Sequence, residues 1–486
     1  MTPSKRIIPL LINGKKIVSK DSLHIPVYST ARHPTTSERE VVHFAQGATV
    51  EQAVEAAITS AAAFNKWRRV SPLQRRELLL ETANILRKRR EDGIEIQMLE
   101  CSPDRNFAAK MYDDAILHVT EWAGLVTSIR GTVPVSETND VLPIVFREPV
   151  GPVFGIAPWN AAPVLSMRSL GMPIAAGCTS VFKTSELSPA SHFSIVEAFI
   201  DAGLPAGVLN VLHVRPQDAP KIVRVLIERP EIRKVNFTGS TRTGREIAIA
   251  AAENLKPVLL EMGGKSASVI LKDADLENAA KHTVVGAWLN QGQICMSTER
   301  VLVSSDIFHK FLEHLKYAAA QLHPHFGQFP QVTPDYADKI HDMISEALEH
   351  GARLVYGSHE RPNDAQLSPT ILAGVSRQSK IYAEESFGPT IIVIPIASDA
   401  EAINIVNESD YGLSASIWTK DVVKGIRLAR DIESGAVHIN GMTVHDQSTL
   451  PHGGVKDSGN GRFGAEWGLN EFTITKTVTV SGFAEH

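Results

Sequence analysis

The chain has 486 residues, of which 43% are hydrophobic and 21% are charged, with 49 basic and 54 acidic side chains. This length exceeds one ordinary hydrophobic core, so we expect about two to four domains. The formal net charge is only −5 and no basic cluster stands out, which argues against a nucleic-acid partner.

The amino terminus carries a short apolar run that Asn13 and two lysines close before a signal peptide could form. Later apolar runs are all too short for a membrane span. A cytoplasmic location without a membrane partner is therefore the prediction.

Between Val50 and Arg90, apolar residues recur at helical spacing and predict two amphipathic helices joined by a turn at Ser71 and Pro72. Residues 131–149 contain two alternating runs around a polar turn, which predict a β-hairpin. Such a hairpin could serve as an oligomer arm.

From Gly151 onward, short apolar runs alternate with helical stretches, as in the parallel βαβ units of a doubly wound sheet. A second such set follows Cys295 and includes a long helix from Ile307 to Leu322. The closing run EFTITKTVTV alternates strongly and could pair with the sheet edge of a partner. We therefore predict an α/β fold with a doubly wound Rossmann-like domain, a second α/β domain and a small β arm.

The three cysteines, Cys101, Cys178 and Cys295, are widely spaced and form no CxxC pair, which argues against disulfides and zinc knuckles. The nearest histidine pair, His323 and His325, flanks a proline in a stretch that resembles a loop, and we predict no metal site there.

Cys295 lies in the polar context LNQGQICMSTERVLV, whereas Cys101 and Cys178 are interpreted as inert buried residues. Glu261 in LLEMGGK and Asn160 in APWN add a carboxylate and an amide. These three groups suit one mechanism: a thiolate attacks an aldehyde carbonyl, amide donors stabilise the oxyanion, and a carboxylate activates water against the thioester.

A candidate hydride acceptor site lies in KVNFTGSTRTGRE, where Gly239 would let the backbone approach a cofactor. The glycine spacing also matches an ATP-binding loop, but Arg245 and Glu246 occupy the positions of its Lys and Ser/Thr. Lys183 and Glu186 follow a predicted strand and either engage an adenosine ribose or are simply solvated.

Taken together, these segments resemble the NAD(P)-dependent aldehyde dehydrogenase superfamily over nearly the full chain. The matching motifs, in chain order, are APWN (157–160), KTSE (183–186), FTGST (237–241), EMGGK (261–265), GQIC (292–295), EESFGP (384–389) and PHGGVKDSGNGRFG near the end.

The resemblance implies that Cys295 is the nucleophile, that Glu261 is the general base for deacylation, and that Asn160 forms the oxyanion hole with the Cys295 amide. It also implies a cofactor-binding set of Ile156, Trp159, Lys183, Glu186, Gly239, Ser240, Glu385 and Phe387. Glu186 favours NAD because its carboxylate would repel a 2′-phosphate, although Lys183 would also tolerate NADP.

The resemblance further divides the chain into an NAD(P)-binding domain (residues 1–130 and 150–260), a catalytic domain (261–455) and oligomerisation β segments (131–149 and 470–486). A homodimer or a homotetramer is expected.

Three positions depart from the family pattern. Ala161 and His452 replace phenylalanines, and His213 begins a segment where relatives carry a glycine-containing turn. The first two substitutions are expected to reshape the substrate cavity, and the third leaves the detail of cofactor contact open.

The segments NAAP, QICMSTERV and VHINGMTVHDQ are similar to the branch that acts on aromatic aldehydes such as salicylaldehyde and vanillin. The predicted substrate pocket contains Ala161, Arg168 and Met296. If the segment after Asn160 is helical, Arg168 shares a face with Val164 and either faces a hydroxylated or anionic ring or forms a structural ion pair.

Other interpretations are an aldehyde dehydrogenase for aliphatic or semialdehyde substrates and, remotely, a non-catalytic protein of the same fold. A CoA-acylating enzyme is disfavoured because such relatives generally lack the carboxylate that Glu261 supplies.

Overall fold

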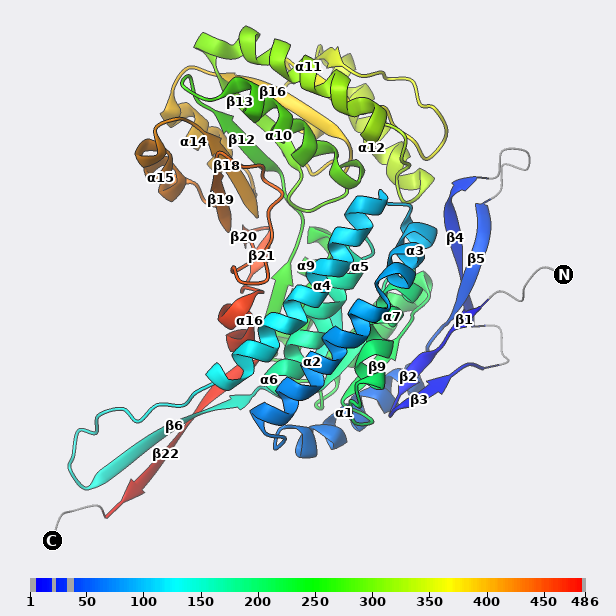
Figure 1. Cartoon of the computed structure of the whole chain (residues 1–486), viewed down its shortest axis with the longest axis vertical. Coiled ribbons are helices and arrows are strands. Elements are labelled where there is room, and N and C mark those ends of the chain that lie inside the picture. Colours follow the sequence, from blue (N-terminus) through cyan, green and yellow to red (C-terminus); the bar gives the residue numbers. More distant parts are fainter. Residues whose placement is uncertain (1–5, 20–22, 33–38, 483–486) are drawn as a thin grey trace.

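The computed structural model describes residues 6–19, 23–32 and 39–482, so residues 1–5 and 483–486 of the predicted domain ranges lie outside the described part. Figure 1 shows a chain built around two large sheets with flanking helices and a projecting two-stranded arm. The predicted fold class is confirmed, while the exact domain limits stay a prediction. Among the described residues, no helix is both long and apolar enough to cross a membrane.

The first sheet has eight strands in the order β21-β11-β10-β7-β8-β9-β2-β3. The five strands from β11 to β9 are parallel, and the outer strands run antiparallel to their neighbours. Their bounds are β21 (Gly459–Asn460), β11 (Val258–Glu261), β10 (Lys234–Thr238), β7 (Val153–Ile156), β8 (Ser180–Lys183), β9 (Leu209–Leu212), β2 (Leu10–Ile12) and β3 (Lys15–Ile17).

Alternate side chains of these strands enter two hydrophobic cores, because successive residues of a strand point to opposite faces. Val153 and Phe182 pack on one face with α2 (Pro72–Lys88), α3 (Arg90–Cys101), α4 (Arg105–Leu125) and α7 (Pro189–Asp201). Phe154 and Val181 pack on the other face with α1 (Val50–Trp67), α8 (Ala219–Glu228) and α9 (Thr241–Glu253). The sheet is therefore covered on both faces, as doubly wound sheets are.

The predicted helix pair between Val50 and Arg90 is confirmed as α1 and α2. Ser71 caps α2, its side chain accepting a hydrogen bond from the Gln74 amide, and Pro72 occupies the first helical position.

The second sheet has the order β14-β15-β16-β13-β12-β18-β19, and only β14 is antiparallel to its neighbour. The strands are β14 (Arg353–Tyr356), β15 (Thr370–Ala373), β16 (Thr390–Ile396), β13 (Thr298–Ser304), β12 (Ser266–Ile270), β18 (Ser414–Trp418) and β19 (Ala436–Ile439). Its helices are α10 (Leu276–Trp288), α11 (Phe308–Phe326), α12 (Pro334–Glu349), α13 (Lys380–Ala383), α14 (Asp399–Asn407) and α15 (Val422–Asp431).

The loop predicted around His323 and His325 was wrong. His323 and His325 lie inside α11, with Pro324 between them, rather than in a loop. The helix continues past the proline while the His323 ring packs against Trp288 and Tyr356, at centroid distances of 6.5 and 5.8 Å.

The predicted hairpin within residues 131–149 was also wrong. Only β6 (Val141–Pro149) forms, and it pairs antiparallel over nine residues with β22 (Thr473–Ser481), the closing strand. Residue Thr132 makes a single isolated bridge to Val145. One edge of β22 thus pairs within the chain, whereas pairing of its other edge with a partner stays a prediction. The β6–β22 arm projects from the body in Figure 1.

The remaining elements are smaller. They comprise β1 (Ile7–Ile8), β4 (His24–Arg32) and β5 (Arg39–Gln46) in a three-stranded sheet, the pair β17 (Tyr411–Gly412) and β20 (Val455–Lys456), and the helices α5 (Ala162–Ser166), α6 (Met172–Ala176) and α16 (Ala465–Glu471).

Candidate active site

The carboxyl ends of neighbouring parallel strands bring several predicted site residues to one edge of the first sheet. Ile156 pairs in register with Lys183 on β8 and with Phe237 on β10, and Thr238 pairs with Glu261 on β11. Open α/β sheets bind ligands at this edge.

Gly239 and Ser240 form the turn from β10 into α9. Ser240 is the N-cap of α9, and a Cβ on Gly239 would lie only 2.6 Å from the Phe237 ring. A glycine is therefore needed at this turn. The free amides of the first turn of α9 are suited to an anion such as a pyrophosphate.

Lys183 is buried at the end of β8, and Glu186 follows it in the next loop. Lys183 Nζ donates to the Thr184 carbonyl at 3.1 Å, which uses one of its three donors. Burial lowers the pKa of Lys183, and the nearby Glu186 carboxylate opposes that shift.

His213, one of the three positions that depart from the family pattern, is buried beside Lys183. Its Nε2 lies 3.0 Å from the Pro9 carbonyl and its Nδ1 lies 2.7 Å from the Thr184 hydroxyl. Burial lowers the pKa of His213 to about 4, so the ring is neutral near pH 7 and fixes the Lys183 strand end.

An aromatic cluster stands beside this edge. The Trp159 ring meets Phe387 and Tyr336 edge-on, at centroid distances of 6.1 and 5.8 Å. Sequence reasoning missed Tyr336, which comes from α12 and belongs to none of the motifs. Beneath the cluster, Cys101 Sγ lies 3.9 Å from the Trp159 carbonyl, and burial raises its pKa well above the usual value.

Glu385 lies half-buried against the EMGGK turn, where the Gly264 amide donates to its carboxyl at 2.9 Å. Burial, reinforced by the Glu299 carboxylate, raises the pKa of Glu385 to about 8. Glu299 is held by an ion pair with Lys265 and accepts the Ser386 amide at 3.0 Å. Sequence reasoning missed this buried Lys265–Glu299 pair, although a lysine in EMGGK and a carboxylate in STERV were its signal.

Cys295 lies in a turn that leads into β13. A Cβ on Gly264 would collide with the Cys295 carbonyl oxygen, so the glycine lets the two loops touch. Burial, and then the nearby Glu261 carboxylate, raises the pKa of the Cys295 thiol well above its usual value. These surroundings favour the neutral thiol over the thiolate.

Asn160 is tied to the cysteine loop from the opposite side. Its Nδ2 donates to the Gln293 carbonyl at 3.0 Å, and Asn290 Nδ2 donates to the Asn160 carbonyl at 3.3 Å. These bonds join Asn160 to the segment that precedes Cys295.

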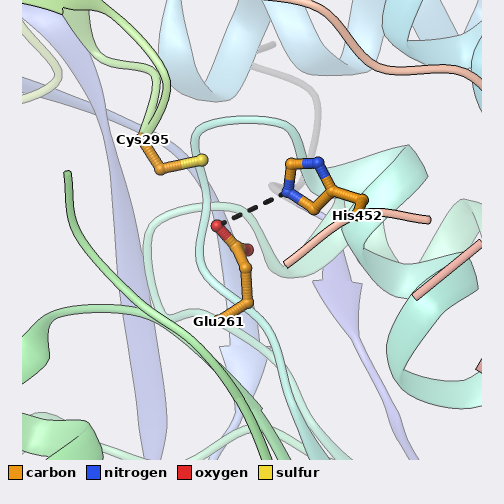
Figure 2. A group of neighbouring side chains, drawn as sticks. All are labelled: Glu261, Cys295 and His452. Carbon is orange, nitrogen blue, oxygen red and sulfur yellow. Dashed lines mark ion pairs between the residues drawn. The ribbon is translucent and has the colours of Figure 1, made fainter. Parts of the chain in front are cut away.

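Glu261 faces Cys295 and His452, as Figure 2 shows. One ligand-type atom from each of the three side chains lies within 4.8 Å of the others. His452 Nε2 is 3.8 Å from Glu261 Oε1, and His452 Nδ1 is 3.9 Å from Asp446 Oδ1. His452, one of the departures from the family pattern, thus lies near Glu261 and also borders the cavity that Met296 lines, which the sequence motif alone did not reveal.

Charge around Glu261 outweighs its burial. Although Glu261 is only 1% exposed and burial by itself raises its pKa, His452 and Arg168 bring the pKa below the ordinary value. Glu261 is therefore a carboxylate at neutral pH.

Arg168 lies on a π-helical turn (Met167–Gly171) between α5 and α6 and forms a buried ion pair with Asp446. Of the two predicted roles, the ion pair is the arrangement present, and contact with a substrate ring stays a prediction. Asp446 was missed by sequence reasoning, since a lone aspartate 278 positions away gives no local signal.

Met296 and Ala161, two residues of the predicted substrate pocket, pack against different clusters. Met296 packs in an apolar cluster with Phe107, Ile294 and Leu413, which Cys295 also contacts, and Ala161 packs against the core of the first sheet. Met296 also borders a cavity of about 270 Å³ whose walls include His438, His445, Leu450 and His452.

A doubly wound sheet with a thiol, a carboxylate and an amide near its ligand edge is an arrangement that suits a cysteine-dependent oxidoreductase. The sequence profile of the aldehyde dehydrogenase family matches residues 18–478. The chain therefore belongs to this family, whose members are NAD(P)-dependent enzymes that oxidise aldehydes to acids.

Individual relatives agree with this assignment. The chain is 40% identical to a salicylaldehyde dehydrogenase of Pseudomonas putida over 460 residues, covering 93% of this chain and 94% of the relative. It is 39% identical to a vanillin dehydrogenase of Pseudomonas fluorescens over 485 residues, covering 99% of each. The crystal structure of a salicylaldehyde dehydrogenase from Pseudomonas putida G7 complexed with salicylaldehyde superimposes with a TM-score of 0.93 at 38% identity, covering 99% of each chain.

Proposed function

We propose that this enzyme oxidises aromatic aldehydes, with Cys295 as nucleophile, Glu261 as the base for deacylation and Asn160 in the oxyanion hole. The observation that carries the proposal is the meeting of Cys295 and Glu261, with ligand-type atoms within 4.8 Å, at the ligand edge of a doubly wound sheet.

In the first half-reaction the Cys295 thiol gives up its proton and the thiolate adds to the aldehyde carbon. Glu261 is the nearby proton acceptor, because its carboxylate is ionised and faces the thiol. The oxyanion accepts hydrogen bonds from Asn160 Nδ2 and the Cys295 amide. A nicotinamide held by Glu385 and Phe387 would supply the acceptor for the hydride of the adduct carbon.

In the second half-reaction the thioester is hydrolysed. Glu261 first passes the thiol proton to solvent, and its carboxylate then takes a proton from water as the water oxygen adds to the acyl carbon. The carbon–sulfur bond breaks, and the leaving thiolate regains a proton from Glu261. The carboxylic acid leaves, and Cys295 is regenerated.

The cofactor edge suits a nicotinamide dinucleotide. The free amides at the start of α9 suit its pyrophosphate, Lys183 and Glu186 suit the adenosine ribose, and Glu385 with Phe387 suits the nicotinamide half. Ile156 and Trp159 would line the same cleft. Glu186 favours NAD over NADP because its charge opposes a 2′-phosphate.

Aromatic specificity is supported by the two relatives named above and by the cavity beside Met296. Its walls combine apolar side chains with histidines, which suits a ring carrying hydroxyl substituents. Ala161 leaves room for a ring where relatives usually place phenylalanine.

We also propose a cytoplasmic homodimer or homotetramer. The β6–β22 arm supports the assembly, because it exposes Phe146, Ile474, Val478 and Val480, and an apolar ribbon of this kind is stable only against another surface.

The test is a steady-state comparison of benzaldehyde, salicylaldehyde and vanillin with propanal and succinate semialdehyde, each with NAD and with NADP. The proposal expects the highest kcat/KM for an aromatic aldehyde with NAD. A preference for an aliphatic or semialdehyde substrate would contradict the proposed aromatic specificity. The lack of nicotinamide reduction with every aldehyde would overturn the proposed aldehyde oxidation. A trapped acyl label on any residue other than Cys295 would overturn the nucleophile.

A further inference from the structure

Cys295, Glu261 and His452 present three different metal-ligating atoms to one point (Figure 2). We propose that they form a binding site for a borderline-soft divalent cation, of which Zn²⁺ is the type, and that the bound cation reversibly blocks the enzyme.

The geometry lies close to that of a metal site. The Sγ, carboxylate oxygen and imidazole nitrogen atoms lie within 4.8 Å of one another, and the oxygen–nitrogen pair is 3.8 Å apart. Tetrahedral zinc with bonds of about 2.0–2.3 Å separates its ligand atoms by about 3.3–3.8 Å. Small side-chain rotations would therefore close the site.

Two of the three ligands are buried with unused polar atoms. Glu261 is 1% exposed and His452 is 7% exposed, and neither Glu261 oxygen nor His452 Nε2 has a hydrogen-bond partner among the described residues. Buried polar atoms without partners are costly, and here they converge on the space beside the thiol.

The surrounding charge favours a dication. A Cys295 thiolate and the Glu261 carboxylate together carry two negative charges, and His452 supplies a neutral nitrogen. Asp446 lies 3.9 Å from the other ring nitrogen of His452, where a carboxylate orients a metal-bound imidazole. Arg168 pairs with Asp446 and keeps it in place.

The ligand set defines the class of ion. One sulfur, one nitrogen and one oxygen select Zn²⁺, Co²⁺ or Cd²⁺ over Mg²⁺ and Ca²⁺, which require oxygen ligands. Binding forms a metal–sulfur bond and releases the thiol proton to solvent, with no change in oxidation state. Binding therefore strengthens as the pH rises.

Blockade follows because the sulfur lone pair that would attack the carbonyl is held by the metal. This consequence rests on the proposed function, whereas binding of the metal itself does not.

The first experiment titrates the purified full-length enzyme with Co²⁺ and records its absorption spectrum. The expected result is one Co²⁺ per chain with a near-ultraviolet cobalt–thiolate band that Zn²⁺ displaces. Cys295→Ser should remove the band, whereas Cys101→Ser should retain it. A spectrum without a thiolate band would overturn the proposal.

The second experiment measures Zn²⁺ inhibition of aldehyde oxidation and its reversal by a chelator, with each variant normalised to its own metal-free rate. His452→Phe and His452→Gln should each raise the inhibition constant at least about tenfold, because both remove a ligand. The matched control is His438→Phe, which removes a histidine from the neighbouring cavity and should leave the constant unchanged. A loss of inhibition in the His438 variant instead would move the metal to that cavity and overturn the proposal.

The two readouts separate this proposal from the proposed function. A cobalt–thiolate band in an enzyme that oxidises no aldehyde would refute the function and retain the metal site. Normal oxidation with no band and no chelator-reversible inhibition would refute the metal site alone.

Discussion

Two glutamates, the half-buried Glu385 on the cofactor side and the buried Glu261 beside Cys295, have pKa values shifted in opposite directions. Glu385 lies beside Glu299, and its pKa rises to about 8 because burial and a like charge add. Glu261 is more deeply buried, only 1% exposed, yet its pKa falls below the ordinary value because His452 and Arg168 outweigh burial. The neighbours of a buried carboxyl, and not its depth, decide which of the two can act as a base at neutral pH.

The largest expected effect contrasts the thiols of the same two regions. Cys295→Ala should lower kcat by at least about 10⁴-fold, because no other group can form the acyl adduct. Cys101→Ala, under Trp159 on the cofactor side, is the matched control and should keep most of the activity. The rate of nicotinamide reduction measures the activity of both variants. Comparable losses of activity in the two would mean that the Cys295 thiol has no special role.

The second effect contrasts the two glutamates directly. Glu261→Gln should lower the steady-state rate by about 10²–10⁴-fold while a burst of nicotinamide reduction remains, because acylation proceeds and deacylation stalls. Glu385→Gln should mainly raise the KM for NAD. A Glu261 variant that turns over at the unmodified rate would remove Glu261 from the base role.

Much of this contrast could be predicted from the sequence, since the motifs place Cys295, Glu261 and Asn160 at strand ends and loops of a doubly wound sheet. The pairing of Arg168 with Asp446 and of β6 with β22 could not, because each joins segments about 300 residues apart with no local pattern to select the partner. The sequence showed that His452 departs from the family pattern. Its distance to Glu261 could not be predicted, because it depends on how the loop that carries His452 folds back over the sheet edge.

The third prediction tests the raised pKa of Glu385 through the pH dependence of the thermal stability of the protein. Its folded pKa of about 8 exceeds its unfolded value, so the protonated form stabilises the fold at low pH and this contribution is lost as pH rises from about 4.5 to 8. Glu385→Gln, which carries no charge, should therefore gain Tm relative to the unmodified apoenzyme as pH rises through that window. Thermal unfolding between pH 5 and 9 measures the difference. A constant difference across the window would show that Glu385 titrates normally.

The fourth effect tests the lowered pKa of Glu261. His452→Phe removes the strongest group that opposes burial, so the pKa of Glu261 should rise and the acid limb of the pH profile of kcat should move to higher pH. The matched control is His445→Phe, because this neighbour in the cavity wall has no contact with Glu261 among the described interactions. An acid limb that stays in place in the His452 variant would assign the lowered pKa of Glu261 to Arg168 and Cys295.

The smallest expected effect lies on the cofactor side and concerns the choice between NAD and NADP. Glu186→Gln removes the negative charge that would repel a 2′-phosphate but keeps the shape of the side chain, and Lys183 remains to attract the phosphate. The ratio of kcat/KM for NAD to that for NADP should fall about tenfold, which corresponds to about 1.4 kcal/mol of discrimination. Glu253→Gln is the matched control, because Glu253 lies exposed at the far end of α9, paired with Arg224. An unchanged ratio in the Glu186 variant would place the discrimination in another group, whereas the same change in both variants would make it an effect of net charge and not of contact with the ribose.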